Sequence, residues 1–168
     1  MKLDTTKIAV SGHSFGGVTS VLTAHEDPRI SACLSIDPWF FPILKNLDSI
    51  KLAKPLLMVN SAKFSRICNS FDVWKSLHSF FSQSPSQHKS GVIVKDLDHI
   101  QQFDMPILVP LELFLSEGVW PSLNAPYKYF MHAQFMLEFL DRIGYNHESL
   151  FDPTDVKRRI TEFTSEYS

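Results

Sequence analysis

Ile8-Ala9-Val10-Ser11-Gly12-His13-Ser14-Phe15-Gly16-Gly17 is the stretch that decides the fold of this chain. Its first three residues form an apolar run typical of a buried strand, and the residues from Val18 to His25 are compatible with a helix. A serine between glycines at such a strand–turn–helix junction is the pattern of a nucleophile elbow. We expect the turn to be too tight for Cβ atoms at the flanking positions and its strain to push the hydroxyl outward, which makes Ser14 our candidate nucleophile. The same pattern also occurs by chance, but the strand, the helix and a further glycine for close packing, Gly17, favour the elbow.

The composition indicates one globular domain. The chain has 168 residues, of which 44% are hydrophobic and 20% charged, and this is enough apolar material for a core. A formal net charge of -2, without any block of like charges, gives no electrostatic basis for binding nucleic acid. No apolar run is long enough to span a bilayer, so we expect no transmembrane segment.

The two cysteines bear on the cellular compartment. Cys33 and Cys68 form neither a C-x-x-C pair nor a disulfide framework, and the chain has no N-x-S/T sequon. Both features weakly favour a cytoplasmic location. A secreted location stays open, because the chain begins only a few residues before the elbow strand and a leader could precede it.

Apolar runs alternate with helical patterns along the rest of the chain, and this alternation predicts a parallel sheet built from βαβ units. The segment 39–52 is expected to be irregular or briefly helical, and 82–90 is expected to be a polar loop. We expect strands at 30–36, 55–60 and 91–95, and helices at 71–81, 107–115 and 127–143, with a last short helix after Asp152-Pro153.

Three polar residues fall at the carboxyl ends of predicted strands, where active sites of parallel sheets lie. The chain order of Ser14, Asp37 and His99 is the order that α/β-hydrolases use for nucleophile, acid and base. Of the seven histidines, His99 alone lies on a loop directly after a late strand. Asp37 is chosen by elimination, because the position after the third strand reads Asn60-Ser61 and offers no carboxylate. The alternative for Asp37 is a simple cap at a strand end.

Two further features of the site follow from the same pattern. The backbone N–H of Phe15, next to the nucleophile, is a candidate oxyanion donor. A group of acidic residues around His99, formed by Asp96, Asp98 and Asp104, suggests a metal site at first sight, but it lacks the spacing of known metal motifs. We therefore expect neither a metal nor a cofactor.

Four segments resemble the platelet-activating factor acetylhydrolases, and the similarity covers most of the chain. They are GHSFGG at 12–17, IDPWFFP at 36–42, PLLMVNSAKF at 55–64 and HIQQFDM at 99–105. The resemblance implies that Ser14 is the nucleophile, Asp37 the orienting acid and His99 the general base. It also implies the substrate, a glycerophosphocholine with a short or oxidised sn-2 acyl chain that is cleaved without calcium. The histidine segment is the loosest match, with Ile100 and Gln101 departing from the family pattern.

Apolar residues beside the predicted acid and base are candidates for an acyl pocket. We predict substrate contacts for Trp39, Phe40 and Phe103, although aromatic residues at strand ends also serve as plain core. A second apolar group resembles the family's interfacial patch, which would allow peripheral binding to a lipid or lipoprotein surface. The alternative for this group is a core helix. Its predicted membrane contacts are Leu108, Leu111 and Phe114.

Compared with a whole α/β-hydrolase, residues 1–168 are expected to form only the C-terminal half of the fold. We predict a single partial domain of about four parallel strands with flanking helices, with the N-terminal strands missing and a polar helical tail from about residue 145. The missing strands would take with them the loop that supplies the second oxyanion donor. A fragment of a full enzyme is the favoured explanation, over a genuine short form or a remnant without catalysis.

These observations together predict a calcium-independent serine esterase that acts on phospholipids resembling platelet-activating factor. The alternative within enzymes is a general carboxylesterase or thioesterase of the same fold. The alternative outside enzymes is a non-catalytic module that binds lipid surfaces.

Overall fold

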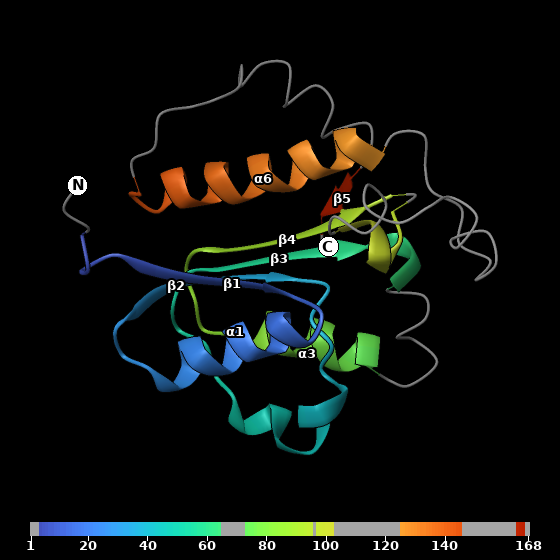
Figure 1. Ribbon diagram of the computed structural model, residues 1–168. Coiled ribbons are helices and arrows are strands. Elements are labelled where there is room, and N and C mark those ends of the chain that lie inside the picture. The colour runs from blue at the N-terminus through green and yellow to red at the C-terminus, as the bar shows by residue number, and fades with distance from the viewer. Residues whose placement is uncertain (1–3, 65–72, 96, 103–124, 146–163, 167–168) are drawn as a thin grey trace.

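The computed structural model describes residues 4–64, 73–95, 97–102, 125–145 and 164–166. Within these ranges the chain forms one five-stranded sheet with the strand order β1-β2-β3-β4-β5. Helices cover both faces of this sheet, so the protein has three layers (Figure 1).

The first four strands are parallel, and each pairs with the next one along the chain. This topology confirms the α/β class that the sequence predicts, because parallel neighbours need a crossover connection between them. The fourth strand begins two residues before its expected start at 91. The strands are β1 (Ile8–His13), β2 (Ile30–Ile36), β3 (Leu56–Ser61) and β4 (Lys89–Val94).

The helices divide between the two faces of the sheet. Helices α1 (Phe15–Glu26) and α3 (Val73–Gln83) lie on one face, and α6 (Ala125–Arg142) lies on the other (Figure 1). All three coincide with predicted helices, and the segment expected to be briefly helical contains the 3-10 helix η1 (Phe41–Ser49). In the described part of the chain, no helix is both long enough and apolar enough to cross a bilayer. The helix predicted at 107–115 lies outside the described residues.

A fifth strand, β5 (Thr164–Glu166), pairs antiparallel with β4. The sequence analysis placed these residues in a helical tail, so the strand differs from the expectation at this point. Three polar residues carry no alternating apolar pattern, and such a short pairing is set by the neighbouring strand instead of by local sequence. The short helix predicted after Pro153 otherwise falls outside the described residues.

Two apolar cores lie on opposite faces of the sheet because successive side chains of a strand point in opposite directions. In β3, Leu56 and Met58 face the core under α1 and α3, whereas Leu57 and Val59 face the core under α6. All six residues of β3 are buried. A continuous apolar strand is therefore expected here, since both of its faces are covered.

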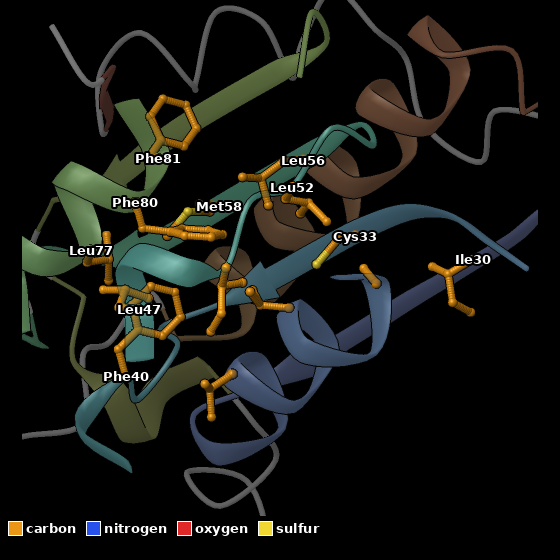
Figure 2. Close-up of a cluster of buried hydrophobic side chains, with 14 of the residues drawn as sticks. Ile30, Cys33, Phe40, Leu47, Leu52, Leu56, Met58, Leu77, Phe80 and Phe81 are labelled. Atoms are coloured by element: carbon orange, nitrogen blue, oxygen red, sulfur yellow. The ribbon is translucent and has the colours of Figure 1, made fainter. Parts of the chain in front are cut away.

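Phe40 belongs to the first core, and this corrects one prediction. Its side chain is fully buried and meets Phe80 of α3 edge-on, with ring centroids 5.3 Å apart. Figure 2 shows it within the cluster that also contains Leu47 and Leu77. The substrate contact predicted for Phe40 is therefore wrong, because the ring is used to fix η1 against α3 and burial of such a ring stabilises the fold by about 2–3 kcal/mol.

Helix α6 carries one buried histidine next to the second core. His132 is nearly inaccessible, and its Nε2 atom has no hydrogen-bond partner among the described residues. Burial, with a smaller effect of the nearby His13, lowers the pKa of His132 from 6.5 to about 4. The folded protein therefore holds this imidazole in its neutral form at neutral pH.

We expect His132 to make the protein less stable in acid. The unfolded chain binds a proton at this imidazole near pH 6.5, whereas the folded protein binds it only near pH 4. The free energy of unfolding should therefore fall by up to about 1.4 kcal/mol per pH unit on acidification through this window, and stay constant above it. Urea unfolding of the wild type and of His132→Phe between pH 4 and 7.5 measures the slope. Parallel curves for the two proteins would refute the assignment.

Candidate active site

The loop between β1 and α1 holds Ser14 in a strained conformation. Its φ and ψ angles are 59° and -118°, a region that non-glycine residues rarely occupy and that costs about 1–3 kcal/mol. Four backbone hydrogen bonds hold it there. The Ser14 N–H donates to the carbonyl of Ile36 at 2.9 Å, and the Ser14 carbonyl accepts from Gly17, Val18 and Trp39 at 3.0–3.2 Å. Helix α1 and the segment after β2 thus fix the serine from two sides.

The glycines of the elbow are required for different reasons. A Cβ atom on Gly12 would lie 2.2 Å from the carbonyl oxygen of Gly16, a backbone atom that cannot move away. A Cβ atom on Gly17 would lie 3.0 Å from the Ile36 carbonyl oxygen, which confirms that this glycine permits close packing of α1 on β2. A Cβ atom on Gly16 would meet no atom within 4 Å among the described residues. The expectation that both flanking positions exclude a side chain is therefore right for Gly12 and wrong for Gly16.

Asp37 follows β2 and is fully buried, with a positive φ of 40°. Its carboxylate accepts five hydrogen bonds, two from Ser61 and one each from three other side chains. Oδ1 accepts from the Ser61 N–H at 2.6 Å and from Asn60 Nδ2 at 3.4 Å. Oδ2 accepts from Ser61 Oγ at 2.6 Å, from His99 Nδ1 at 3.1 Å and from Gln102 Nε2. Asp37 is therefore more than a cap at a strand end.

Burial and hydrogen bonding act on Asp37 in opposite directions. Burial raises the pKa of the Asp37 carboxyl group, while the hydrogen bonds from His99 and Ser61 favour the ionised form and lower it. An ionised carboxylate in a dry environment is costly unless donors surround it. The five donated hydrogen bonds offset part of this cost, while burial has the larger effect and keeps the pKa of Asp37 above its usual value.

Asn60, Ser61 and Gln102 are site residues that the sequence analysis missed. The pair Asn60-Ser61 occupies the position where many hydrolases keep their acid, and was set aside because it has no carboxylate. The structure shows that this pair donates to the acid of the neighbouring strand. A recognisable signal existed, because two polar residues end a strand that is otherwise apolar and completely buried.

His99 begins the short 3-10 helix η2 (His99–Gln102) and joins the two other predicted residues. Its Nδ1 atom lies 3.1 Å from Asp37 Oδ2, and its Nε2 atom lies 2.9 Å from Ser14 Oγ. A carboxylate at Nδ1 fixes the tautomer with the proton on Nδ1, so Nε2 is left to accept the serine proton. The Asp98 side chain accepts the N–H of His99 at 2.7 Å and so helps to fix the start of η2. Asp96 lies outside the described residues.

His13 lies beside His99, with ring centroids 4.4 Å apart. His13 is therefore a further site residue to which the sequence pattern assigned no role. Burial, followed by the proximity of His99, lowers the pKa of His13 to about 4, so the ring is neutral at neutral pH. Phe64, after β3, stacks on the same imidazole at 4.0 Å.

Donor atoms of His13, Asp37 and His99 all lie within 4.8 Å of one another, which makes them the geometric candidate for a cation site. This group differs from the acidic group considered from the sequence. The His99 nitrogen atoms are already engaged, one by Asp37 and the other by Ser14. A cation would have to compete with both hydrogen bonds, so the donor set fits proton transfer better than metal binding.

Three exposed aromatic residues lie on the segments that adjoin the serine. Trp39 and Phe41 stack on each other at a centroid distance of 5.8 Å, and both are exposed, as is Phe15. The Phe15 N–H belongs to the first turn of α1, whose N–H groups have no carbonyl acceptor within the helix. Its oxyanion role and the substrate contact of Trp39 stay predictions. The other predicted contacts, Phe103, Leu108, Leu111 and Phe114, lie outside the described residues.

The arrangement suits nucleophilic catalysis on a carbonyl group. A serine hydroxyl, an imidazole and a buried carboxylate follow one another at hydrogen-bond distance, so a proton leaving Ser14 has an acceptor that the carboxylate orients.

Comparison with known proteins gives the family. A family model described as platelet-activating factor acetylhydrolase, isoform II, matches residues 1–144. The chain belongs to this family.

Platelet-activating factor acetylhydrolase of Cavia porcellus is 35% identical over 97 residues, which are 58% of this chain and 21% of the relative. The acetylhydrolase of Bos taurus is 40% identical over 62 residues, 37% of this chain and 14% of the relative. Hydrolase ffsE of Aspergillus flavipes is 55% identical over 40 residues, 24% of this chain and 9% of the relative. The matched region thus spans about a fifth or less of these relatives.

Substitutions of two elbow glycines, Gly12 and Gly16, should differ in their effect on the stability of this acetylhydrolase-family chain. Gly12→Ala forces a Cβ atom against a backbone carbonyl and should lower the free energy of unfolding by about 2–3 kcal/mol. Gly16→Ala meets open space within a helix and should leave stability unchanged or raise it by up to about 1 kcal/mol. Denaturant unfolding measures both values. Equal losses for the two variants would contradict the packing described above.

Ser61→Ala should impair turnover without impairing substrate binding. The variant removes the hydroxyl that donates to Asp37 Oδ2 and keeps the backbone N–H. Losing one hydrogen bond to a charged group costs about 1.5–3 kcal/mol, so kcat should fall roughly ten- to a hundredfold with little change in KM. Ser84→Ala is the matched control, because Ser84 is also buried and its hydroxyl donates to the Phe80 carbonyl instead of to Asp37. An unchanged kcat in Ser61→Ala would remove Ser61 from the site.

Proposed function

We propose that this protein is a serine esterase of the platelet-activating factor acetylhydrolase type, with Ser14 as nucleophile, His99 as general base and Asp37 as orienting acid. The observation that carries the proposal is the pair of hydrogen bonds that link His99 to Ser14 and to Asp37. Membership of the acetylhydrolase family supports it independently.

The first half of the reaction forms an acyl-enzyme. Ser14 Oγ attacks the ester carbonyl while its proton passes to His99 Nε2, and the carbonyl π bond becomes an oxyanion. The Phe15 N–H donates to this oxyanion. The tetrahedral intermediate then collapses, the bond to the alcohol oxygen breaks, and His99 returns the proton to that oxygen. The alcohol that leaves is the lysophospholipid.

The second half releases the acid. Water attacks the acyl-enzyme carbonyl and gives its proton to His99, the bond to Ser14 Oγ breaks, and the proton returns to the serine. Asp37 stays ionised throughout and stabilises the imidazolium that forms twice in each cycle. The nucleophile and all proton transfers are supplied by side chains, so this cycle has no step that needs calcium.

The proposed substrate is a glycerophosphocholine with a short or oxidised sn-2 acyl chain. The names of the relatives support this choice, since the proteins of Cavia porcellus and Bos taurus are both termed platelet-activating factor acetylhydrolase. The exposed Trp39 next to the serine loop offers an apolar wall for the substrate. Association with a lipid or lipoprotein surface is part of the same proposal.

The test uses the purified protein and a fluorophosphonate probe, which labels activated serines. Wild type should be labelled and should hydrolyse an acetyl phospholipid, whereas Ser14→Ala should lose labelling and at least about a thousandfold in kcat. Ser49→Ala is the matched control, because Ser49 is an exposed serine on η1 that bonds only locally.

Three outcomes would contradict the proposal in different ways. A wild type that is neither labelled nor active, yet binds vesicles equally well with and without Ser14, would indicate a lipid-binding module. Equal rates on acetyl and long-chain phospholipids would indicate a general esterase. Labelling that survives Ser14→Ala would place the nucleophile elsewhere.

A further inference from the structure

His99 lies between two aromatic rings that come from different strands. The Phe64 ring is stacked on the imidazole with centroids 4.0 Å apart and planes 17° apart. The His13 ring approaches at 4.4 Å with an interplanar angle of 33°. His13 ends β1 and Phe64 follows β3, and these strands flank β2 on its two sides. Since the acid that holds His99 follows β2, the two rings reach the imidazole from opposite sides.

The hydrogen bonds of His99 leave one motion unrestrained. Bonds at Nδ1 and Nε2 fix the imidazole along the line from Asp37 to Ser14 but permit the ring to tilt about that line. The backbone of His99 belongs to a 3-10 helix of only four residues, which gives little support of its own. Rings on both faces of the imidazole prevent the tilt.

Phe64 is itself firmly held. It is buried in the same core as Phe80 and Leu77, and its N–H donates to Ser61 Oγ at 3.4 Å. The turn after β3 therefore serves the site twice, through Ser61 at the acid and through Phe64 at the base. A ring fixed in this way can keep its face on His99 throughout the reaction.

The two neighbouring rings suit a base that becomes charged. When the imidazole accepts the serine proton, a cation forms 4.0 Å from the face of Phe64, within the distance at which an aromatic face attracts a cation. His13 is neutral at neutral pH, as described above, so it does not repel this cation. A cationic side chain at either position would oppose the proton transfer.

We propose that Phe64 and His13 are positioning residues for His99, and that the face of Phe64 also stabilises the imidazolium formed during catalysis. This inference rests on the proposed function, because it assigns roles relative to a catalytic His99. It adds two residues that act through His99.

Several charged or titratable groups face His99 and have to be considered in any pH experiment. Asp37 contacts its Nδ1, Asp98 accepts its backbone N–H, and His13 lies against its ring. Lys63 lies 3.9 Å from the Asp98 carboxylate, and His132 lies beyond His13. None of these groups is altered by a substitution at Phe64, so a changed pH profile in such a variant reports on the ring.

The experiment compares wild type with Phe64→Leu, Phe64→Tyr and the control Phe80→Leu. Phe64→Leu should lower kcat by about three- to thirtyfold, the range that corresponds to a lost cation–aromatic contact, with KM nearly unchanged. The acid limb of its kcat/KM profile should move to lower pH by about half a unit or more, because the protonated base loses its stabilising face. Phe64→Tyr keeps the aromatic face and should recover most of the lost rate. Phe80→Leu removes an equally buried ring from the same core and should leave the profile unmoved.

The second position is tested with His13→Phe and His13→Gln, and the former should retain more activity because it keeps an aromatic face. An active wild type in which Phe64→Leu behaves like Phe80→Leu, with no shift of the acid limb, would overturn this inference and leave the esterase proposal intact. A drop in kcat that Phe64→Tyr fails to recover would also overturn it. An inactive, unlabelled wild type would instead refute the proposed function.

Discussion

A carboxylate without access to water governs this site. Asp37 is fully buried, and an ionised group in such a position requires hydrogen-bond donors on every side. The donors come from the end of β3, through Asn60 and Ser61, and from η2, through His99 and Gln102. The carboxyl ends of β2, β3 and β4 therefore have to lie level with one another along the strand direction. The parallel registers of these three strands provide this alignment. The location of His99 relative to Ser14 is a consequence of satisfying the Asp37 carboxylate.

The site depends equally on the strained backbone conformation of Ser14. Ser14 is held in an unfavourable conformation by hydrogen bonds to Ile36 and Trp39, which lie on the two sides of Asp37 in the chain. The segment that carries Asp37 thus also holds Ser14. Because Asp37 has a positive φ as well, two strained residues lie next to each other in space and share one set of restraints. Strain of this kind persists only where surrounding contacts over-determine it, and the packing of α1 on β2 through Gly17 supplies such contacts.

Much of this arrangement could be predicted from the sequence, because strong local patterns carry it. The four parallel strands follow from continuous apolar runs, and Ser14, Asp37 and His99 follow from their positions directly after those runs. What the sequence could not give depends on contacts between distant segments. Phe40 and Trp39 are adjacent aromatic residues with similar local signals, yet one is core and the other exposed, and only the packing of η1 against α3 separates them. Likewise, β5 is defined by its pairing with β4. The contact between the His13 and His99 rings joins residues far apart in the sequence, so no local pattern predicts it.

The placement of the acid on β2 has a further consequence. Because Asp37 follows the strand next to the elbow, Ser14, Asp37, His99 and the side chains that donate to Asp37 all come from one uninterrupted run of neighbouring strands, from β1 to the turn after β4. No distant part of the sheet has to be in register for these side chains to meet. Length changes in the loops at the opposite ends of these strands would therefore leave the distances among Ser14, Asp37 and His99 unchanged.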